Sequence, residues 1–260
     1  MSLGDMNVLI CGIANERSLA YAAAQALITA GGAVWCTWQG EAQHKRVQRC
    51  LKQLGERAHD AGRWDVREDA DAQAVVQRLQ GHGVRLQGLL HAMAFAQLQD
   101  AQGDPQPVHQ VDADGWAEAM EVSARSLPMM LTALRPCMAE DGFSAVTLTF
   151  HGARQVVPGY NMMGVAKAAL EAGVRYCAAE LGPLGVRVNA VSAGSVRTVA
   201  SSNVPGFAAR QEHAASTAPL RRGVQAEEVA QAITWLLSAQ ASGITGATIP
   251  VDCGLHVLAP

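Results

Sequence analysis

The sequence predicts an α/β fold, a doubly wound parallel sheet with helices on both of its faces. Short apolar runs that suit buried parallel strands alternate with longer helical patterns along the 260 residues. A chain of this length, 49% hydrophobic and 17% charged, can bury one large core. Neither a Pro/Gly/Ser-rich linker nor an internal repeat interrupts the alternation, so we expect residues 1–260 to form a single domain.

The elements follow one another in a regular order. The first strand is expected at Asn7–Cys11, an apolar run that ends at Gly12. Ser18 is a favourable N-cap for the Ala-rich helix that follows, and Gly31 and Gly32 end that helix. Further strands are expected at Ala33–Trp38, 62–66 (the end of a third strand), 88–92, 144–149, 186–190 and Thr248–Val251. Further helices are expected at 41–54, 69–80, about 113–139, 160 to about 182, and 226–238.

Charge and composition exclude several classes of function. The formal net charge is −3 and the basic residues are scattered, which argues against nucleic acid or an acidic membrane surface as a partner. The N-terminus has neither a basic start nor a long apolar segment, so we expect a cytoplasmic protein without a signal peptide or membrane span. The widely spaced cysteines contain no CxxC pair, and we interpret them as small core residues in a reducing compartment rather than disulfide or metal ligands: Cys11, Cys36, Cys50, Cys137, Cys177 and Cys253.

The pair formed by Tyr160 and Lys167 is the most informative local feature. Lys167 is one of only three lysines, and it stands seven residues after Tyr160 in GYNMMGVAKAAL. On a helix this step returns to nearly the same face about two turns along. A phenol and an ammonium placed in this way can hold a substrate oxygen and a sugar hydroxyl together. A core tyrosine beside a surface lysine would leave the same spacing, so the strand ends decide between the two interpretations.

Ligands of doubly wound sheets bind outside the carboxyl ends of the strands. After the first strand, Gly12 allows a tight turn, and the helix that starts near Ser18 offers N–H groups to a pyrophosphate. An ordinary turn and N-cap would read the same way, because the segment is not a GxGxxG fingerprint. After the second strand, the neutral Gln39 favours NADH over NADPH, unless it is simply a loop residue; Lys45 and Arg46 fall further on, within a helix.

The third to fifth strand ends carry further candidates. Asp65 could accept a hydrogen bond from an adenine amino group or cap the helix at 69–80, while Trp64 is expected to pack. His91 lies within a strand and is expected to be structural, whereas His151 is a candidate proton donor or a loop residue. Phe150 is expected near the site. In HAMAFA the side chains small enough to let a cofactor approach are Ala92, Ala94 and Ala96.

After the sixth strand, the segment SAGSVRTVASSNVPGFAARQ is rich in small residues. This composition is typical of a mobile loop rather than of a packed element. We therefore expect a substrate lid at about 195–215.

Together these motifs resemble the short-chain dehydrogenase/reductase superfamily, and within it the bacterial NADH-dependent enoyl-[acyl-carrier-protein] reductases. The resemblance runs from about residue 7 to residue 258 and implies a single-domain Rossmann-type fold. The loop from Gly12 to 18–20, in place of the commoner glycine-rich pattern, and the six-residue gap between Tyr160 and Lys167 are typical of that branch. The segments PLRRGVQAEEVA and ITGATIPVDCG also look like family segments.

The resemblance implies roles for individual residues. The implied cofactor-binding residues are Gly12, Ser18 and Leu19 at the pyrophosphate, Gln39 at the adenosine ribose, Asp65 and Val66 at the adenine, Met93, Lys167 at the nicotinamide ribose, and Val196, Thr198 and Ala200 at the carboxamide and lid. The implied catalytic group is Tyr160, Lys167 and Phe150, and the implied substrate contacts are Ala96, Phe150 and Tyr160. A homotetramer is also implied, for which the apolar last strand and the helix at 226–238 could serve as interface.

The implied reaction is reduction of the trans-2 double bond of an enoyl thioester by NADH in fatty acid biosynthesis. Hydride delivered to the β-carbon places negative charge on the thioester carbonyl oxygen, and a donor aimed there stabilises the transition state. Tyr160 would be that donor, since a free tyrosine with a pKa of about 10 is protonated at neutral pH. The Lys167 ammonium would make the proton of Tyr160 easier to share.

Three departures from the family pattern concern the substrate. Phe150 stands where many relatives have a second tyrosine, and HAMAFA replaces HSIGFA, which puts Ala92 and Ala94 beside the cofactor. The lid is often basic in relatives that use an acyl carrier protein, but here only Arg210 is clearly basic, with Arg197 nearer the cofactor. Electrostatic steering of an acidic carrier would be weaker, so the carrier could be acyl carrier protein or coenzyme A.

Two alternatives remain open from the sequence. A reductase of the same fold could act on another activated alkene or a carbonyl in a specialised pathway. Analysis of the product would distinguish it from an enoyl-thioester reductase, since reduction of a carbonyl gives an alcohol. A nicotinamide-binding protein without catalysis, acting as a sensor or scaffold, would bind the cofactor and turn over neither kind of substrate.

Overall fold

A parallel sheet forms the centre of the computed structural model, which describes residues 3–4, 6–100, 102–198, 201, 204 and 206–258. Its strands are β1 (Asn7–Cys11), β2 (Ala33–Trp38), β3 (Ala58–Arg63), β4 (Gly88–His91), β5 (Phe143–Thr149), β6 (Val186–Ala193) and β7 (Thr248–Val251). They lie in the order β3-β2-β1-β4-β5-β6-β7, and every neighbouring pair is parallel. The order changes direction between β1 and β4, which confirms the predicted doubly wound sheet.

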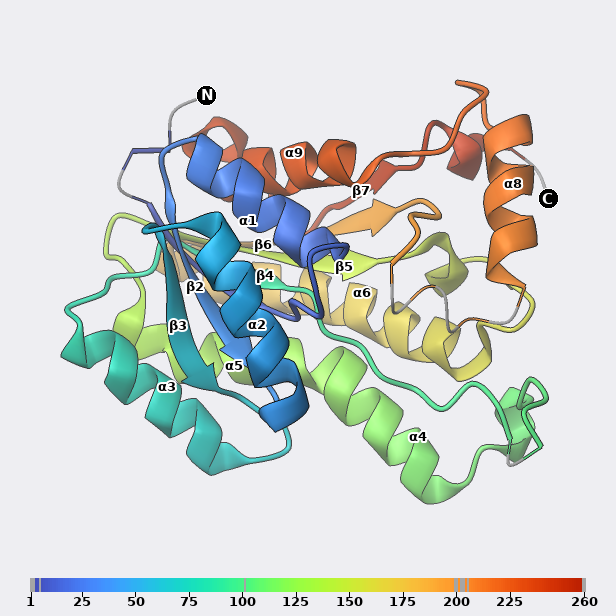
Figure 1. Ribbon diagram of the computed structural model, residues 1–260, viewed down its shortest axis with the longest axis horizontal. Helices are drawn as coiled ribbons and strands as arrows, with labels where there is room; N and C mark the ends of the chain where they lie inside the picture. The colour runs from blue at the N-terminus through green and yellow to red at the C-terminus, as the bar shows by residue number, and fades with distance from the viewer. Residues whose placement is uncertain are drawn as a thin grey trace.

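Helices cover both faces of the sheet (Figure 1). One face carries α1 (Leu19–Thr29), α2 (Glu41–Leu54) and α9 (Ala226–Leu237); the other carries α3 (Asp69–Gly81), α5 (Ser126–Leu134) and α6 (Asn161–Leu181). Two further helices, α4 (Ala113–Met120) and α8 (Phe207–Thr217), lie toward the carboxyl ends of the strands. Within the described ranges, no helix combines the length and apolar character needed to cross a membrane.

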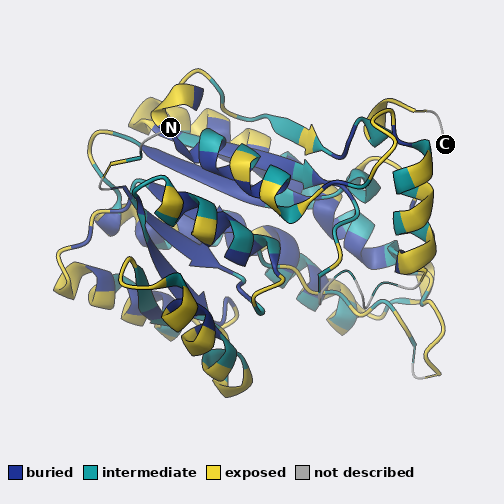
Figure 2. Cartoon of the chain, turned by 45° about the horizontal axis from the view of Figure 1, so that its top comes forward, coloured by how far each residue is buried: buried dark blue, intermediate teal, exposed yellow. Residues whose placement is uncertain are grey.

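The strands divide the interior into two cores because successive side chains point to opposite faces. In β1, Val8 and Ile10 pack toward α1 and α9, whereas Leu9 and Cys11 pack toward α3 and α5. All four side chains are fully buried, and Figure 2 shows the sheet as the darkest part of the molecule. The buried apolar runs that predicted these strands therefore reflect helices on both faces.

The third strand lies earlier than the sequence pattern indicated. β3 ends at Arg63, so the prediction of a strand end at 62–66 was wrong by three residues. Trp64 and Val66, which suggested the strand, are buried in the core beneath α3 as part of the connection after it. β3 itself is a polar edge strand in which Asp60 accepts a hydrogen bond from Nε1 of Trp38 at 3.0 Å.

The long helix expected at about 113–139 is interrupted. A π-helical turn at Glu121–Arg125 separates α4 from α5, and α5 ends at Leu134 before a 3-10 turn. The buried Ser123 of this turn donates to the carbonyl of Phe95 and accepts from its N–H, both at 2.8 Å. The turn therefore holds the segment that follows β4, in keeping with the frequent use of π turns near functional sites.

The segment expected to be an unpacked lid contains a helix. α8 begins after Gly206, which has a φ of 71°, and the side chain of Phe207 is buried. The expectation of a stretch without packed structure was therefore wrong for residues 207–217. Ala200, expected at the cofactor, lies outside the described residues.

Candidate functional site

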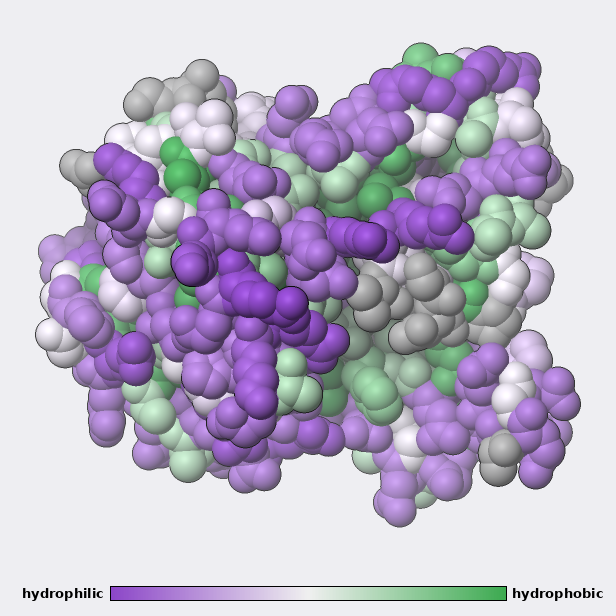
Figure 3. All heavy atoms as spheres, viewed as in Figure 1, coloured by the Kyte–Doolittle hydropathy of each residue, from purple (hydrophilic) through white to green (hydrophobic). Residues whose placement is uncertain are grey.

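A cavity of about 360 Å³ opens at the carboxyl ends of β4, β5 and β6. The side chains of Phe95, Val157, Met163, Val204 and Phe207 make much of its wall apolar. Figure 3 shows hydrophobic side chains gathered in a hollow between the α8 and α4 sides of the molecule. The sequence-predicted site residues that line this cavity are Leu19, Met93, Ala96, Phe150, Tyr160, Lys167, Val196 and Thr198.

Tyr160 precedes α6 by one residue, with backbone angles (φ −88°, ψ −24°) that are close to helical. Its ring meets that of Phe150 edge-on, with the centroids 5.1 Å apart. Gly152 makes room for this ring, because a Cβ there would lie 2.6 Å from Cδ1 of Tyr160. Burial raises the pKa of Tyr160 above its ordinary value, so the hydroxyl is a donor at neutral pH. We expected the Lys167 ammonium to make this proton easier to share, but the effect of burial on the pKa of Tyr160 is larger.

Lys167 is buried on α6, and its Nζ donates a hydrogen bond to the carbonyl of Leu148 at 2.8 Å. Burial lowers the pKa of Lys167 to about 8, and the nearby charge of Glu171 opposes this shift. An ammonium has three donors. The contact with Leu148 uses one, and among the described residues no other acceptor is in contact, so two donors remain for hydroxyl groups in the cavity.

Gly12 and α1 form the turn that follows β1. Gly12 has a φ of 107°, and a Cβ there would lie 2.1 Å from the carbonyl oxygen of Ala92 in the segment after β4. Ser18 caps α1 as expected, because its Oγ accepts from the N–H of Tyr21 at 3.3 Å. The N–H groups of Leu19 and Ala20 have no acceptor in the part of the chain that the structure describes. Such orphan donors suit an anion.

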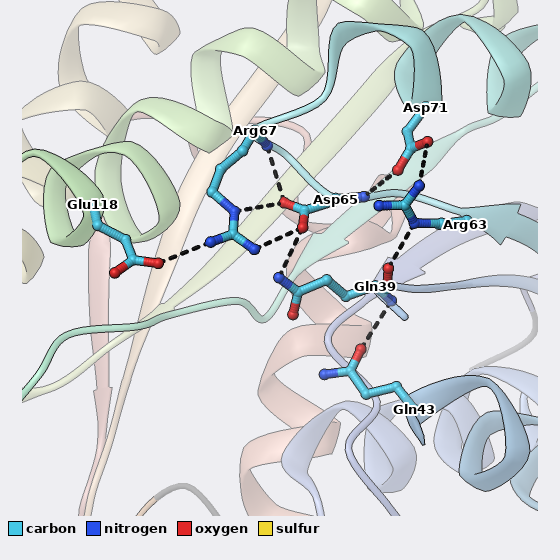
Figure 4. Close-up of polar contacts among 7 residues, drawn as sticks. All are labelled: Gln39, Gln43, Arg63, Asp65, Arg67, Asp71 and Glu118. Atoms are coloured by element: carbon cyan, nitrogen blue, oxygen red, sulfur yellow. Dashed lines mark hydrogen bonds and ion pairs between the residues drawn. The ribbon is translucent and has the colours of Figure 1, made fainter. Parts of the chain in front are cut away.

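Gln39 and Asp65 meet beyond the ends of β2 and β3 (Figure 4). The amide of Gln39 donates to Oδ2 of Asp65 at 3.1 Å, and Arg63 donates through Nε to the carbonyl of Gln39 at 3.0 Å. Asp65 does not cap α3; instead Asp71, in the first turn of that helix, accepts from the N–H of Asp65 at 2.8 Å. The two residues expected to bind adenosine therefore form one network.

Arg67 holds the carboxylate of Asp65 in place. Its Nε and Nη2 donate to the two oxygens of Asp65 at 2.9 and 2.7 Å, and its backbone N–H donates to Oδ1 at 3.1 Å. These hydrogen bonds hold the pKa of Asp65 well below its ordinary value. With the amide of Gln39, the carboxylate has four donors and is saturated. An adenine amino group would have to take the place of the Gln39 amide.

The remaining candidates divide clearly. Val66 has its side chain in the core, so its backbone N–H is the group that it can offer to a ligand. His91 is structural, as predicted: its ring bonds Thr147 and Ser126 at 2.8 Å each, and burial lowers its pKa to about 3. His151 packs on Phe150 with the ring centroids 3.9 Å apart and does not line the described part of the cavity.

Gly12, Ser18, Gln39, Asp65 and Val66 do not line the cavity but follow the ends of β1, β2 and β3 along the same edge of the sheet. Together with the cavity they outline an extended site. Sequence reasoning missed the roles of Gly152, Arg67 and Glu171. Only Glu171 carried a signal, because it stands one turn after Lys167 on the same helix.

A sequence profile described as Enoyl-(Acyl carrier protein) reductase matches residues 12–256. The protein "Enoyl-[acyl-carrier-protein] reductase [NADH] 1" of Rhizobium meliloti is 40% identical over 250 residues, which cover 96% of this chain and 90% of the relative. The chain belongs to the enoyl-[acyl-carrier-protein] reductase family.

Solved structures of this family share the fold of the chain. The enoyl-acyl carrier protein reductase of Bacillus cereus, solved with NADP+ and indole naphthyridinone, superposes with a TM-score of 0.94 at 34% identity and 100% coverage of both chains. The NADH enoyl-[acyl-carrier-protein] reductase of Aquifex aeolicus gives a TM-score of 0.92 at 34% identity and 99% coverage of both chains. The seven-stranded sheet and its helices are therefore those of this enoyl reductase family.

Proposed function

We propose that the protein reduces the trans-2 double bond of an enoyl thioester with NADH, the enoyl-reduction step of fatty acid biosynthesis. The observation that carries the proposal is the placement of Tyr160 and Lys167 in one cavity at the strand ends of the sheet. The phenol is held protonated, and among the described residues the ammonium spends one of its three donors, on the carbonyl of Leu148.

The residues present fit a dinucleotide along the edge of the sheet. The orphan N–H groups of Leu19 and Ala20 suit the pyrophosphate, and Lys167 can donate to the ribose hydroxyls next to the nicotinamide. When bound, the reduced nicotinamide supplies the hydride. At the other end, the N–H of Val66 and, once the Gln39 amide is displaced, the carboxylate of Asp65 can meet the two kinds of polar atom on an adenine edge.

Tyr160 donates its hydroxyl proton to the thioester carbonyl oxygen, where charge develops as the double bond is reduced. Phe150 beside it supplies an apolar edge and no second donor, so this stabilisation rests on one phenol. The apolar wall formed by Phe95, Met163 and Phe207 excludes water from the acyl chain.

The charges at the adenosine end favour NADH over NADPH. A 2′-phosphate needs a cation that is not already neutralised. Arg63 pairs with Asp71 at 3.5 Å, and Arg67 pairs with both Asp65 and Glu118. Gln39 is neutral, and Lys45 and Arg46 lie on α2 as expected. Arg63 and Arg67 are therefore already paired with carboxylates of the chain itself.

Replacing Arg67 by alanine is expected to raise the KM for NADH about tenfold and to leave kcat within about twofold. Asp65 then loses the charge-assisted hydrogen bonds that hold its carboxylate in place, which weakens binding of the adenine by about 1–1.5 kcal/mol. The reacting carbon is unaffected. Steady-state kinetics with NADH as the varied substrate measures both constants. Arg85→Ala is the matched control, because among the described residues this exposed arginine hydrogen-bonds only the carbonyl of Pro136, at the amino ends of the strands and away from the site. A lower kcat with an unchanged KM would contradict the assignment.

Three further features belong to the proposal. Arg210, the basic residue of the lid, lines the cavity and donates to the carbonyl of Pro158 at 3.1 Å, whereas Arg197 is exposed and can meet an acidic carrier protein. We expect a homotetramer in which the half-exposed edge strand β7 and α9 contribute to the interface.

The six cysteines are buried and unpaired, which supports a reducing, cytoplasmic location.

The test is an assay of NADH oxidation with a trans-2-enoyl thioester, offered on acyl carrier protein and on coenzyme A. We expect NADH to be consumed faster than NADPH and the product to be the saturated acyl thioester. If NADH is not consumed with either carrier at any chain length, the proposal is overturned. A carbonyl substrate reduced to an alcohol would instead support the alternative reductase.

A further inference from the structure

Glu171 is a buried carboxylate on the face of α6 that carries Lys167. Glu171 is 4% exposed, and the two residues stand four apart on the helix, the spacing at which side chains are neighbours. Its Oε1 accepts from the hydroxyl of Thr149 at 2.9 Å, and its Oε2 accepts from Nε of Arg154 at 2.8 Å. Both oxygens are thus fixed, by a strand residue and by the loop after that strand.

The last two residues of β5 hold both members of this helical pair. The carbonyl of Leu148 accepts from Lys167, and the hydroxyl of the next residue, Thr149, donates to Glu171. One strand end therefore sets the positions of the ammonium and the carboxylate relative to each other.

We propose that Glu171 is a positioning residue for Lys167: its carboxylate, fixed by Thr149 and Arg154, supplies the negative charge that keeps the buried ammonium protonated beside the cavity. The role belongs to the reaction proposed above, in which Lys167 must donate to ribose hydroxyls. A buried lysine without such a charge loses its proton readily, because burial disfavours the charged form.

The other groups around Lys167 do not supply that charge. His91 on β4 is uncharged at neutral pH, because burial lowers its pKa to about 3. Tyr160 is also uncharged, because burial raises its pKa. Arg154, which pairs with Glu171, carries a positive charge and so supplies no negative charge to the ammonium. In the described part of the site, the charged group that raises the pKa of Lys167 is Glu171.

A purely structural role for Glu171 would be to anchor the loop of Phe150 through Arg154. The two roles predict different shifts of the Lys167 pKa in variants of Glu171 and Arg154. Under the structural role, losing either member of the Glu171–Arg154 pair disturbs the site in the same way. Under the electrostatic role, Glu171→Gln lowers the pKa of Lys167, whereas Arg154→Gln raises it, since the second variant removes a positive charge.

The test measures the protonation of Lys167 directly. The chain contains only Lys45, Lys52 and Lys167, so the NMR signals of lysine labelled with ¹³C at Cε can be assigned with Lys167→Met. In the ligand-free protein we expect a Lys167 titration midpoint near pH 8. Glu171→Gln should lower this midpoint by about one pH unit, and Arg154→Gln should raise it. The signals of Lys45 and Lys52 serve as internal controls.

Shifts of the Lys167 midpoint in the same direction in both variants, or in neither, would overturn the proposal. Arg154 is 62% exposed, so Arg154→Gln keeps the test decisive if Glu171→Gln does not fold. The measurement needs neither NADH nor an enoyl thioester, so a failure of the proposed reaction does not affect it. In an active enzyme, the alkaline limb of kcat/KM for NADH should follow the same two shifts, because the ammonium is lost as pH rises through the pKa of Lys167.

Discussion

Replacing Tyr160 by phenylalanine is expected to lower kcat for enoyl reduction by about 10²–10³-fold, the loss that follows removal of one donor to a developing oxyanion. The change removes only the hydroxyl, and the ring contact with Phe150 remains. Because Phe150 offers no second donor, the ring beside Tyr160 cannot replace the lost hydroxyl. The KM for NADH should change by less than about twofold, since Lys167 remains in place.

Tyr176→Phe is the matched control for this substitution. Tyr176 lies on the same helix, α6, but it is 70% exposed and does not line the described part of the cavity. It should retain the activity of the unmodified protein. A Tyr160→Phe enzyme with kcat within twofold of that protein would show that the phenol is not the donor, and the proton source would then have to lie elsewhere in the cavity.

Replacing Gly12 by alanine is expected to lower the free energy of unfolding by about 3–5 kcal/mol, through overpacking and backbone strain together. The new Cβ would lie 2.1 Å from the carbonyl oxygen of Ala92, which is backbone and cannot rotate away. The φ of 107° is also unfavourable for any residue with a Cβ. For a chain of this size the midpoint of thermal unfolding should fall by roughly 10 °C, measured by circular dichroism or calorimetry.

Gly173→Ala provides the control for this prediction. Gly173 lies inside α6, and no described atom stands within 4 Å of the Cβ that alanine would add. Helix propensity alone should then leave stability unchanged or raise it by up to about 1 kcal/mol. Equal unfolding temperatures for Gly12→Ala and Gly173→Ala would mean that β1 and β4 can separate freely at their carboxyl ends, contrary to the contact between Gly12 and Ala92.

The sequence predicted most of the sheet because buried parallel strands are apolar on both faces. β1 and β2 match the expected bounds, and β7 matches as well. β3 does not, since an edge strand such as AHDAGR is polar and leaves no such run. The π turn within 121–125 was also missed, because it is stabilised by the contact between Ser123 and Phe95, 28 residues apart, and not by local propensity.

The candidate site was predictable where it depends on strand ends and unpredictable where it depends on side-chain pairs distant in sequence. Tyr160, Lys167 and Phe150 line one cavity as expected, because all three follow or face the end of β5. The pairs Arg154–Glu171 and Arg67–Glu118 join residues 17 and 51 positions apart, and no motif marks them. The helix at 207–217 was missed because its small residues were interpreted as a loop, although alanine favours helices.

The π turn between α4 and α5 also sets the orientation of α4 about its own axis relative to α5. In a regular α-helix each residue advances by about 100°, so the extra residue of a π turn rotates everything on its N-terminal side by about that angle relative to α5. α5 is anchored to the sheet by Leu127 and Leu131, which leaves α4 as the part that turns. Glu118 reaches Arg67 at 2.8 Å from this rotated position. One residue in the middle of a helix thus decides which face of α4 meets the adenosine end of the site.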